Sequence, residues 1–139
     1  MEIVEFSEKY RNQVVALWQG CNLIFSRNDP NKDIDRKLKV NPELFLVGLL
    51  GGEVVATVMG GYEGHRGWIN YLAVSPGQRK KGFGRQIMAA VESRIQEKGC
   101  PKINLQVRET NLDVMAFYSA IGYGNDPVIS FGKRLEPEV

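Results

Sequence analysis

Basic and glycine residues gather between positions 79 and 85, in the order Arg-Lys-Lys-Gly-Phe-Gly-Arg. The alternating apolar stretch before them, 71–74, predicts a strand that leads to a turn at Pro76, and apolar residues recur with helical spacing from Phe83 to Ile95. The start of a helix has unpaired backbone N–H groups and partial positive charge, and both favour a bound phosphate. This stretch therefore predicts a pyrophosphate site.

Each residue type in the loop has a part in binding such a ligand. Gly82 and Gly84 lack Cβ atoms, so a phosphate can approach the backbone closely, and the basic side chains add positive charge. The residues that we expect to contact the pyrophosphate are Arg79, Lys80, Lys81, Gly82, Phe83, Gly84 and Arg85. Spacing excludes two other motifs: a dinucleotide-binding fingerprint needs a third glycine where Ile87 stands, and a P-loop needs lysine directly after Gly82.

Composition limits the classes of protein that this chain can belong to. With 139 residues, 43% of them apolar, residues 1–139 are expected to form a single domain with a sizeable core. A net charge of +2 is too small to predict a nucleic-acid partner. The longest apolar run, 44–50, has seven residues, far fewer than the roughly 18 that span a membrane. The first residues do not form a signal peptide, so we expect a cytoplasmic protein, and the two cysteines and one histidine predict no metal site.

Secondary-structure signals occur along the whole chain. Two glycines between apolar runs predict a hairpin, Asp29 and Pro30 predict a helix start, and Lys98 with Gly99 predicts a helix end. In chain order, the expected elements are a strand at 2–6, a helix capped by Ser7 that ends near Gly20, a short polar helix at 30–38, strands at 44–50, 53–59 and 67–74, a helix at 83–97, a strand at 102–107, a helix at 111–120, and one or two strands at 123–135. Because a helix separates 67–74 from 102–107, those two strands should be parallel.

Two motifs in this order resemble a known family. The first is the Arg79-x-x-Gly82-x-Gly84 loop after residues 72–76, and the second begins at Asn111 and continues through Tyr118 to the glycine and tyrosine at 122–123. The chain resembles the GCN5-related N-acetyltransferases (GNAT superfamily), and within them the small bacterial YpeA-type acetyltransferases, through 28–30, 57–62 and 64–67. The resemblance implies an α/β (α+β) fold with a mixed, mostly antiparallel sheet of six to seven strands, about four helices, and a splayed parallel pair at strands 4 and 5.

The same resemblance implies an activity. A GNAT enzyme transfers an acetyl group from acetyl-CoA, its cosubstrate, directly to a primary amine, here of an unidentified small molecule or protein. The pyrophosphate would sit on the 79–85 loop, and the pantetheine arm would pair with Leu72, Ala73 and Val74. A bulge in that strand would present the N–H group of Ala73 or Val74 to the developing oxyanion.

The resemblance also assigns side chains to proton transfer. Tyr118 matches the tyrosine that protonates the departing thiolate, and a phenol pKa near 10 suits that donor. Asn111 matches a residue that binds the cofactor, although it could equally be a helix N-cap. Glu63 is the nearest candidate for the general base, with His65, Glu109 or a water molecule as alternatives.

Two other functions are consistent with parts of the sequence. One is a non-catalytic acyl-CoA-binding module, against which the complete Tyr118 pattern argues. The other is a nucleic-acid-binding protein that uses the basic loop, but only Phe83 lies among those charges, and its place in the helical stripe predicts burial. Family members commonly dimerise through late strands, and residues 128–131 could pair in this way in a homodimer.

Overall fold

The computed structural model describes residues 1–25 and 27–137. Its chain divides into two compact units, Met1–Leu105 and the part that begins at Gln106. The helices and strands of the first unit are β1 (Glu2–Glu5), α1 (Arg11–Gly20), α2 (Pro30–Lys37), β2 (Phe45–Leu50), β3 (Glu53–Tyr62), β4 (Gly67–Val74), α3 (Phe83–Glu97) and β5 (Ile103–Asn104). The second unit contains α4 (Leu112–Ala120).

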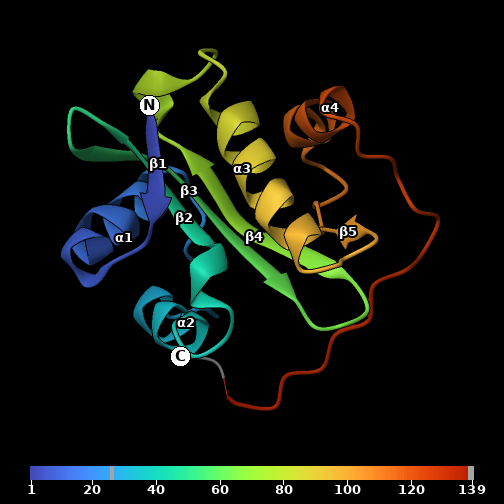
Figure 1. Cartoon of the computed structure of the whole chain (residues 1–139). Helices are drawn as coiled ribbons and strands as arrows, with labels where there is room; N and C mark the ends of the chain where they lie inside the picture. Colours follow the sequence, from blue (N-terminus) through green and yellow to red (C-terminus); the bar gives the residue numbers. More distant parts are fainter. Residues whose placement is uncertain (26, 138–139) are drawn as a thin grey trace. The chain divides into compact units, whose positions relative to one another are not determined.

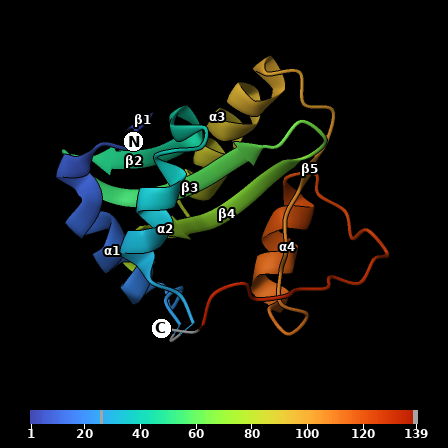
Figure 2. The same cartoon turned by 90° about the horizontal axis from the view of Figure 1, so that it is seen from below.

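The first unit is a sheet covered by helices on both faces. Its strands follow the order β1-β2-β3-β4-β5, with antiparallel pairs up to β4 and a parallel β4–β5 pair. Helices α1 and α2 lie on one face of this sheet and α3 lies on the other, which Figures 1 and 2 show from two directions. The mixed sheet and its parallel fourth and fifth strands are confirmed.

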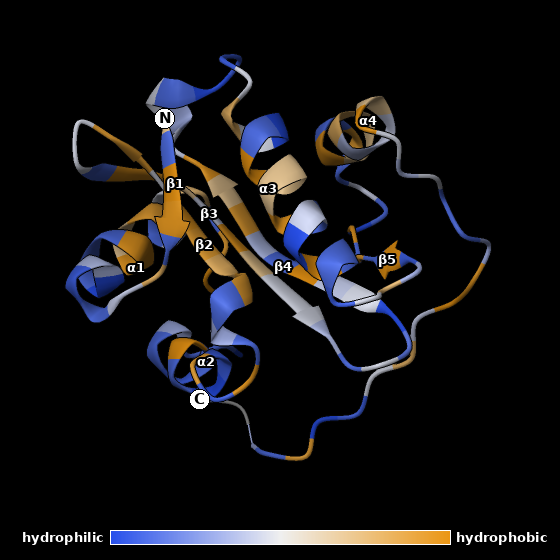
Figure 3. Ribbon diagram, in the orientation of Figure 1, coloured by the Kyte–Doolittle hydropathy of each residue, from blue (hydrophilic) through white to orange (hydrophobic). Residues whose placement is uncertain are grey.

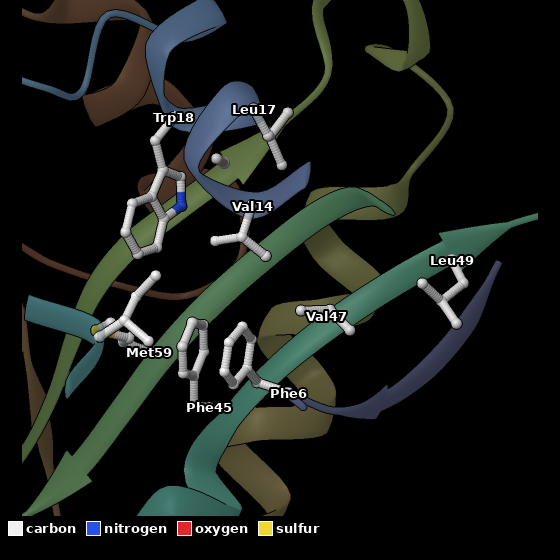
Figure 4. Packing of buried hydrophobic residues seen from close by; sticks show 10 residues of the cluster. Phe6, Val14, Leu17, Trp18, Phe45, Val47, Leu49 and Met59 are labelled. Carbon is white, nitrogen blue, oxygen red and sulfur yellow. The ribbon is translucent and has the colours of Figure 1, made fainter. Parts of the chain in front are cut away.

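Aromatic packing between α1 and the sheet forms one half of the core. The Phe6 ring stacks on Phe45 at 4.5 Å between centroids, and Trp18 of α1 lies 6.3 Å from the same ring (Figure 4). Val14 and Trp18 are completely buried. By contrast, α2 buries only Ile34, which fits its short polar sequence. Figure 3 shows that α2 is largely polar, whereas β2 is largely apolar.

Three local signals in the sequence are confirmed by backbone geometry. Gly51 and Gly52 have φ of 59° and 82°, as a tight hairpin turn requires, and they join β2 to β3. Asp29 caps α2, because its side chain accepts hydrogen bonds from the backbone N–H groups of Asn31 and Lys32. The left-handed Gly99, with φ of 89°, follows the end of α3.

Some expected elements differ in the structure. The described sheet has five strands instead of six to seven, because residues 123–135 form none, and β5 covers only two of the six expected residues. In that tail, Val128, Ile129 and Phe131 are 78%, 85% and 93% exposed. An alternating pattern specifies a strand only where a partner strand pairs with it, and no described strand does so here. Pairing of this segment in a homodimer stays a prediction.

The start of α1 also differs from the expectation. A 3₁₀ turn, Glu8–Tyr10, precedes the helix, and the Ser7 side chain makes no capping hydrogen bond. The turn is closed by the Tyr10 N–H, which donates to the Ser7 carbonyl over 2.9 Å, and by an ion pair between Arg11 and Glu8. The Ser7 carbonyl, and not the Ser7 hydroxyl, therefore accepts the hydrogen bond from a first-turn N–H group.

Helix α3 packs closely against β3 at a glycine. A Cβ atom on Gly60 would lie 2.6 Å from Val91 Cγ2 and 3.1 Å from Ile95 Cδ1, both on the buried face of α3. The helix that begins at the basic loop is therefore held against the sheet without an intervening side chain at this point.

This contact gives a testable prediction for stability. Gly60→Ala should lower the free energy of unfolding by about 1–3 kcal/mol, because the new methyl overpacks a rigid contact. Denaturant unfolding followed by circular dichroism measures it. The matched control is Gly20→Ala, whose Cβ meets nothing within 4 Å and which should leave stability unchanged or slightly raised. Equal effects of the two substitutions would contradict the close contact.

Candidate functional site

Strand β4 has an open edge toward β5. The two strands pair only at Gly67 with Ile103 and at Trp68 with Asn104. From residue 69 to residue 74, β4 has no strand partner on that side within the described parts of the chain. Backbone N–H and C=O groups along an unpaired edge can pair with an extended ligand, as an added strand would. The expected splay of strands 4 and 5 is therefore a feature of this structure.

A bulge lies within the open part of β4. Thr57 of β3 pairs with Ala73 and Met59 pairs with Asn70, so one β3 residue opposes two β4 residues between these pairs. The extra residue is accommodated at Tyr71, whose φ is 51°. Asn70 lies on the same face as its partner Met59, and the Tyr71 ring stacks on Trp18 of α1. Two consecutive residues of the strand thus face α1.

The basic loop leads into an uncapped helix. Lys80 and Gly82 have positive φ angles of 64° and 81°, whereas Arg79 has −76° and Lys81 is not left-handed. Arg79 is extended, with a ψ of 163°, and the left-handed residues after it turn the chain into α3. The N-cap of α3 is Gly82, which has no side chain to accept from the N–H groups of the first turn. The N-terminal end of α3 can therefore bind a phosphate.

The basic side chains of the loop are exposed, and Arg79 and Lys81 are among those that make hydrogen bonds. Arg79 Nε donates to the Val74 carbonyl over 3.3 Å, and its Nη2 lies 3.7 Å from Cys21 Sγ. Lys81 Nζ donates to Gln78 Oε1 over 2.8 Å. Arg79 thus lies against the end of β4 instead of extending from the loop.

Phe83 differs from its expected burial. It is half-buried at the first position of α3, while Ile87, Val91 and Ile95 on the same stripe are completely buried. The reason is its position at the helix end, where the stripe reaches the edge of the core.

In the second unit, Asn111 and Tyr118 belong to the same helix. Asn111 is the N-cap of α4, since its Oδ1 accepts from the Val114 N–H over 3.3 Å. Tyr118 is 8% exposed, and its ring makes edge contacts with Phe117 at 5.2 Å and Tyr123 at 5.5 Å between centroids. Burial raises the pKa of Tyr118 to about 12, so the phenol keeps its proton throughout the neutral range.

Glu63 has a structural role in the turn between β3 and β4. Its Oε1 accepts from the backbone N–H groups of Arg66 and His65, and these hydrogen bonds hold the pKa of the exposed carboxyl below its usual value. A carboxylate with a lowered pKa is a weaker base. The turn precedes Gly67, which is about 13 Å along an extended strand from Tyr71. Its assignment as general base stays a prediction, and this geometry does not favour it.

Comparisons with known proteins place these features in a family. The model of the "Acetyltransferase (GNAT) family" matches residues 10–123. The chain belongs to the GNAT family of acetyltransferases. A protein named an acetyltransferase from Yersinia enterocolitica is 44% identical over 135 residues, which cover 97% of this chain and 96% of the relative. A relative from Yersinia pestis with the same identity and coverage is described as an uncharacterized N-acetyltransferase.

Solved GNAT structures share the fold. Ard1 from Thermoplasma volcanium has a TM-score of 0.79 at 27% identity and covers 87% of this chain and 80% of its own. The aminoglycoside acetyltransferase AAC(6')-Iy, solved with a bisubstrate analogue built on CoA, also has a TM-score of 0.79 at 18% identity, with coverage of 96% and 97%. The chain is thus an N-acetyltransferase with the GNAT fold.

Sequence reasoning missed the residues that shape the β4 bulge. Tyr71 entered the analysis only as part of an alternating strand, and nothing in that pattern indicates a left-handed backbone. A weak signal existed at Thr57, which is the one polar residue among the apolar residues of 54–59 and is completely buried. A buried hydroxyl needs hydrogen-bond partners, so Thr57 could have indicated a special contact between β3 and β4.

Neither a membrane helix nor a metal cluster occurs in the described residues. None of the helices within 1–25 and 27–137 has the length and apolar character needed to cross a bilayer. The same residues contain no group of three or more metal-ligating side chains that could hold an ion.

Burial of Tyr118 predicts a pH dependence of stability. An unfolded tyrosine has a pKa near 10, so the stabilising difference is complete below about pH 10 and is lost as the pH rises toward 12. Between pH 9 and 11 the wild type should lose about 1 kcal/mol of stability that Tyr118→Phe does not lose. Urea unfolding at both pH values measures this, and an identical pH dependence of the two proteins would contradict the protected phenol.

Proposed function

We propose that this GNAT enzyme binds acetyl-CoA along β4 and the start of α3 and transfers the acetyl group directly to a primary amine. The observation that supports this best is an open strand edge that leads to the start of a helix. The open edge of β4, residues 69–74, leads through the left-handed residues of the loop to the uncapped first turn of α3. An extended arm that ends in a pyrophosphate matches both parts of this path.

The cosubstrate would use the loop and the strand for different parts of its structure. The pyrophosphate accepts hydrogen bonds from the first turn of α3, with Lys80, Lys81 and Arg85 around it. The pantetheine amides pair with the open edge at Leu72, Ala73 and Val74. Because Arg79 already donates to the Val74 carbonyl, an amide that uses this carbonyl shares it with Arg79 or displaces the guanidinium.

In the proposed reaction, the bulge in β4 positions a backbone N–H group near the thioester. The amine nitrogen attacks the thioester carbon, and an N–H group beyond the bulge, at Ala73 or Val74, stabilises the oxyanion. Collapse of this intermediate breaks the C–S bond, and the thiolate takes a proton from Tyr118. The attacking nitrogen gives its proton to water or to a base. The raised pKa of Tyr118 makes it a weaker acid than an ordinary phenol but keeps it protonated at every working pH.

The acceptor in this proposal is a primary amine of a small molecule or a protein. AAC(6')-Iy is described as an aminoglycoside acetyltransferase, and two other solved structures with the same fold have a similar description. These likenesses are below 25% identity, so they support only the general class of amine acceptor. A non-catalytic acyl-CoA-binding protein would have the same β4 edge but would release no thiol when amines are added.

The first test separates the contribution of the loop from that of the strand. Lys80→Ala combined with Lys81→Ala should weaken acetyl-CoA binding about tenfold at low salt, since two charges near the pyrophosphate are lost. Binding of acetyl-pantetheine, which has no pyrophosphate, should hardly change. Calorimetry measures both affinities. Lys39→Ala, at an exposed position after α2, is the matched control, and an equal loss for both ligands would contradict this placement of the phosphates.

The second test concerns proton donation to the thiolate. Tyr118→Phe should lower kcat about a hundredfold and leave the KM for acetyl-CoA nearly unchanged, because the ring and its packing are kept while the proton is lost. Release of free thiol in the presence of amines measures turnover. Phe117→Leu, a neighbour on the same helix, is the control for packing. Unchanged turnover in Tyr118→Phe would contradict the role of the phenol.

A further inference from the structure

A single buried hydroxyl connects α1 to the β4 bulge. Thr57 of β3 is completely buried, and its Oγ1 accepts a hydrogen bond from Trp18 Nε1 over 2.9 Å. The same hydroxyl donates to the backbone carbonyl of Tyr71 over 2.9 Å. Its one proton is therefore directed at the bulge, because the indole N–H can only donate.

Tyr71 adopts a backbone conformation that its side chain disfavours. A φ of 51° is uncommon for any residue with a Cβ and is an outlier for a bulky one in the middle of a strand. Such a conformation persists only where the surroundings hold it, and it occurs most often at functional sites. The cause should therefore be found in the contacts of Tyr71.

Three contacts from three different elements hold Tyr71. Its carbonyl accepts from Thr57 of β3, and its ring stacks on Trp18 of α1 at 3.8 Å between centroids. Its phenol donates to Asp33 Oδ2 of α2 over 2.6 Å. Burial, and then the Asp33 carboxylate, raise the pKa of the Tyr71 phenol, so this donor keeps its proton in the neutral range. The backbone, ring and phenol of Tyr71 are thus each held by a different element.

We propose that Thr57 is a positioning residue for acetyl transfer: by holding the Tyr71 carbonyl it sets the β4 bulge, and with it the backbone N–H that faces the thioester oxygen. This inference rests on the proposed function. The bulge lies where β4 does not pair with β5, so within the described chain no strand pairing on that side helps to fix residues 71–73. An oxyanion donor must be held within a fraction of an ångström, and the hydroxyl of Thr57 supplies a fixed point next to it.

Thr57→Val and Thr57→Ser form a matched pair of variants. Valine keeps the shape of threonine but cannot donate to the Tyr71 carbonyl, whereas serine keeps the donor and loses a methyl group. Thr57→Val also leaves the Trp18 N–H without its partner, so it should lower stability. Ile95→Ala is the control for that loss, because Ile95 is fully buried on α3 beside Gly60 and Gly67, at the end of β4 away from the bulge.

Turnover separates positioning from stability. At a temperature where all variants are folded, Thr57→Val should lower kcat about tenfold or more, with a much smaller change in the KM for acetyl-CoA. The kcat of Thr57→Ser should lie within about threefold of wild type, and that of Ile95→Ala should do so as well despite its lower melting temperature. A Thr57→Val enzyme with wild-type kcat would overturn the inference and leave the proposed function intact.

A structural measurement decides the question without turnover. The amide ¹H–¹⁵N signals of residues 71–74 should shift in Thr57→Val and remain near wild-type positions in Thr57→Ser and Ile95→Ala. If no amine gives thiol release with the wild type, the proposed function fails while these shifts still report whether Thr57 holds the bulge. Unchanged signals in Thr57→Val would overturn the inference in either case.

Discussion

A buried hydroxyl group imposes the constraint on which the candidate site depends. Polar groups without water must find partners inside the protein, and the partners of Thr57 are the indole of Trp18 and the carbonyl of Tyr71. Satisfying this one side chain connects α1, β3 and β4. This strand pairs on both sides only at Gly67 and Trp68; it then bulges and has an open edge, which is the geometry that an extended ligand requires.

Much of the fold could be predicted because its signals are local. The Gly51–Gly52 turn, the Asp29 cap and the Gly99 helix end each depend on a few neighbouring residues, and each is confirmed. The expected strands in 123–135 are wrong for the opposite reason. A strand is defined by a partner elsewhere in the chain, and apolar alternation around Val128 does not reveal whether such a partner exists.

In the candidate site, too, local features could be predicted from the sequence and features that depend on distant residues could not. The basic loop and the start of α3 were found from sequence, since glycines, charges and helical spacing lie within a few residues of one another. The bulge was expected only from family resemblance. The role of Tyr71 in it was not predicted, because the shift in register depends on how β3 and β4 align. The Glu63 carboxylate illustrates a further limit, since its use by two backbone N–H groups of the turn becomes visible only in three dimensions.

The open edge of β4 also sets a length. Its six residues, 69–74, extend about 20 Å at the rise of a strand. Helix α3 is held against the sheet by its contact with Gly60 of β3. Under the proposed function, β4 and α3 together fix the distance between the bulge and the phosphate-binding turn. A carrier arm shorter or longer than pantetheine would place its thioester out of register with the bulge, so the fold selects the carrier by length, independently of the acyl group.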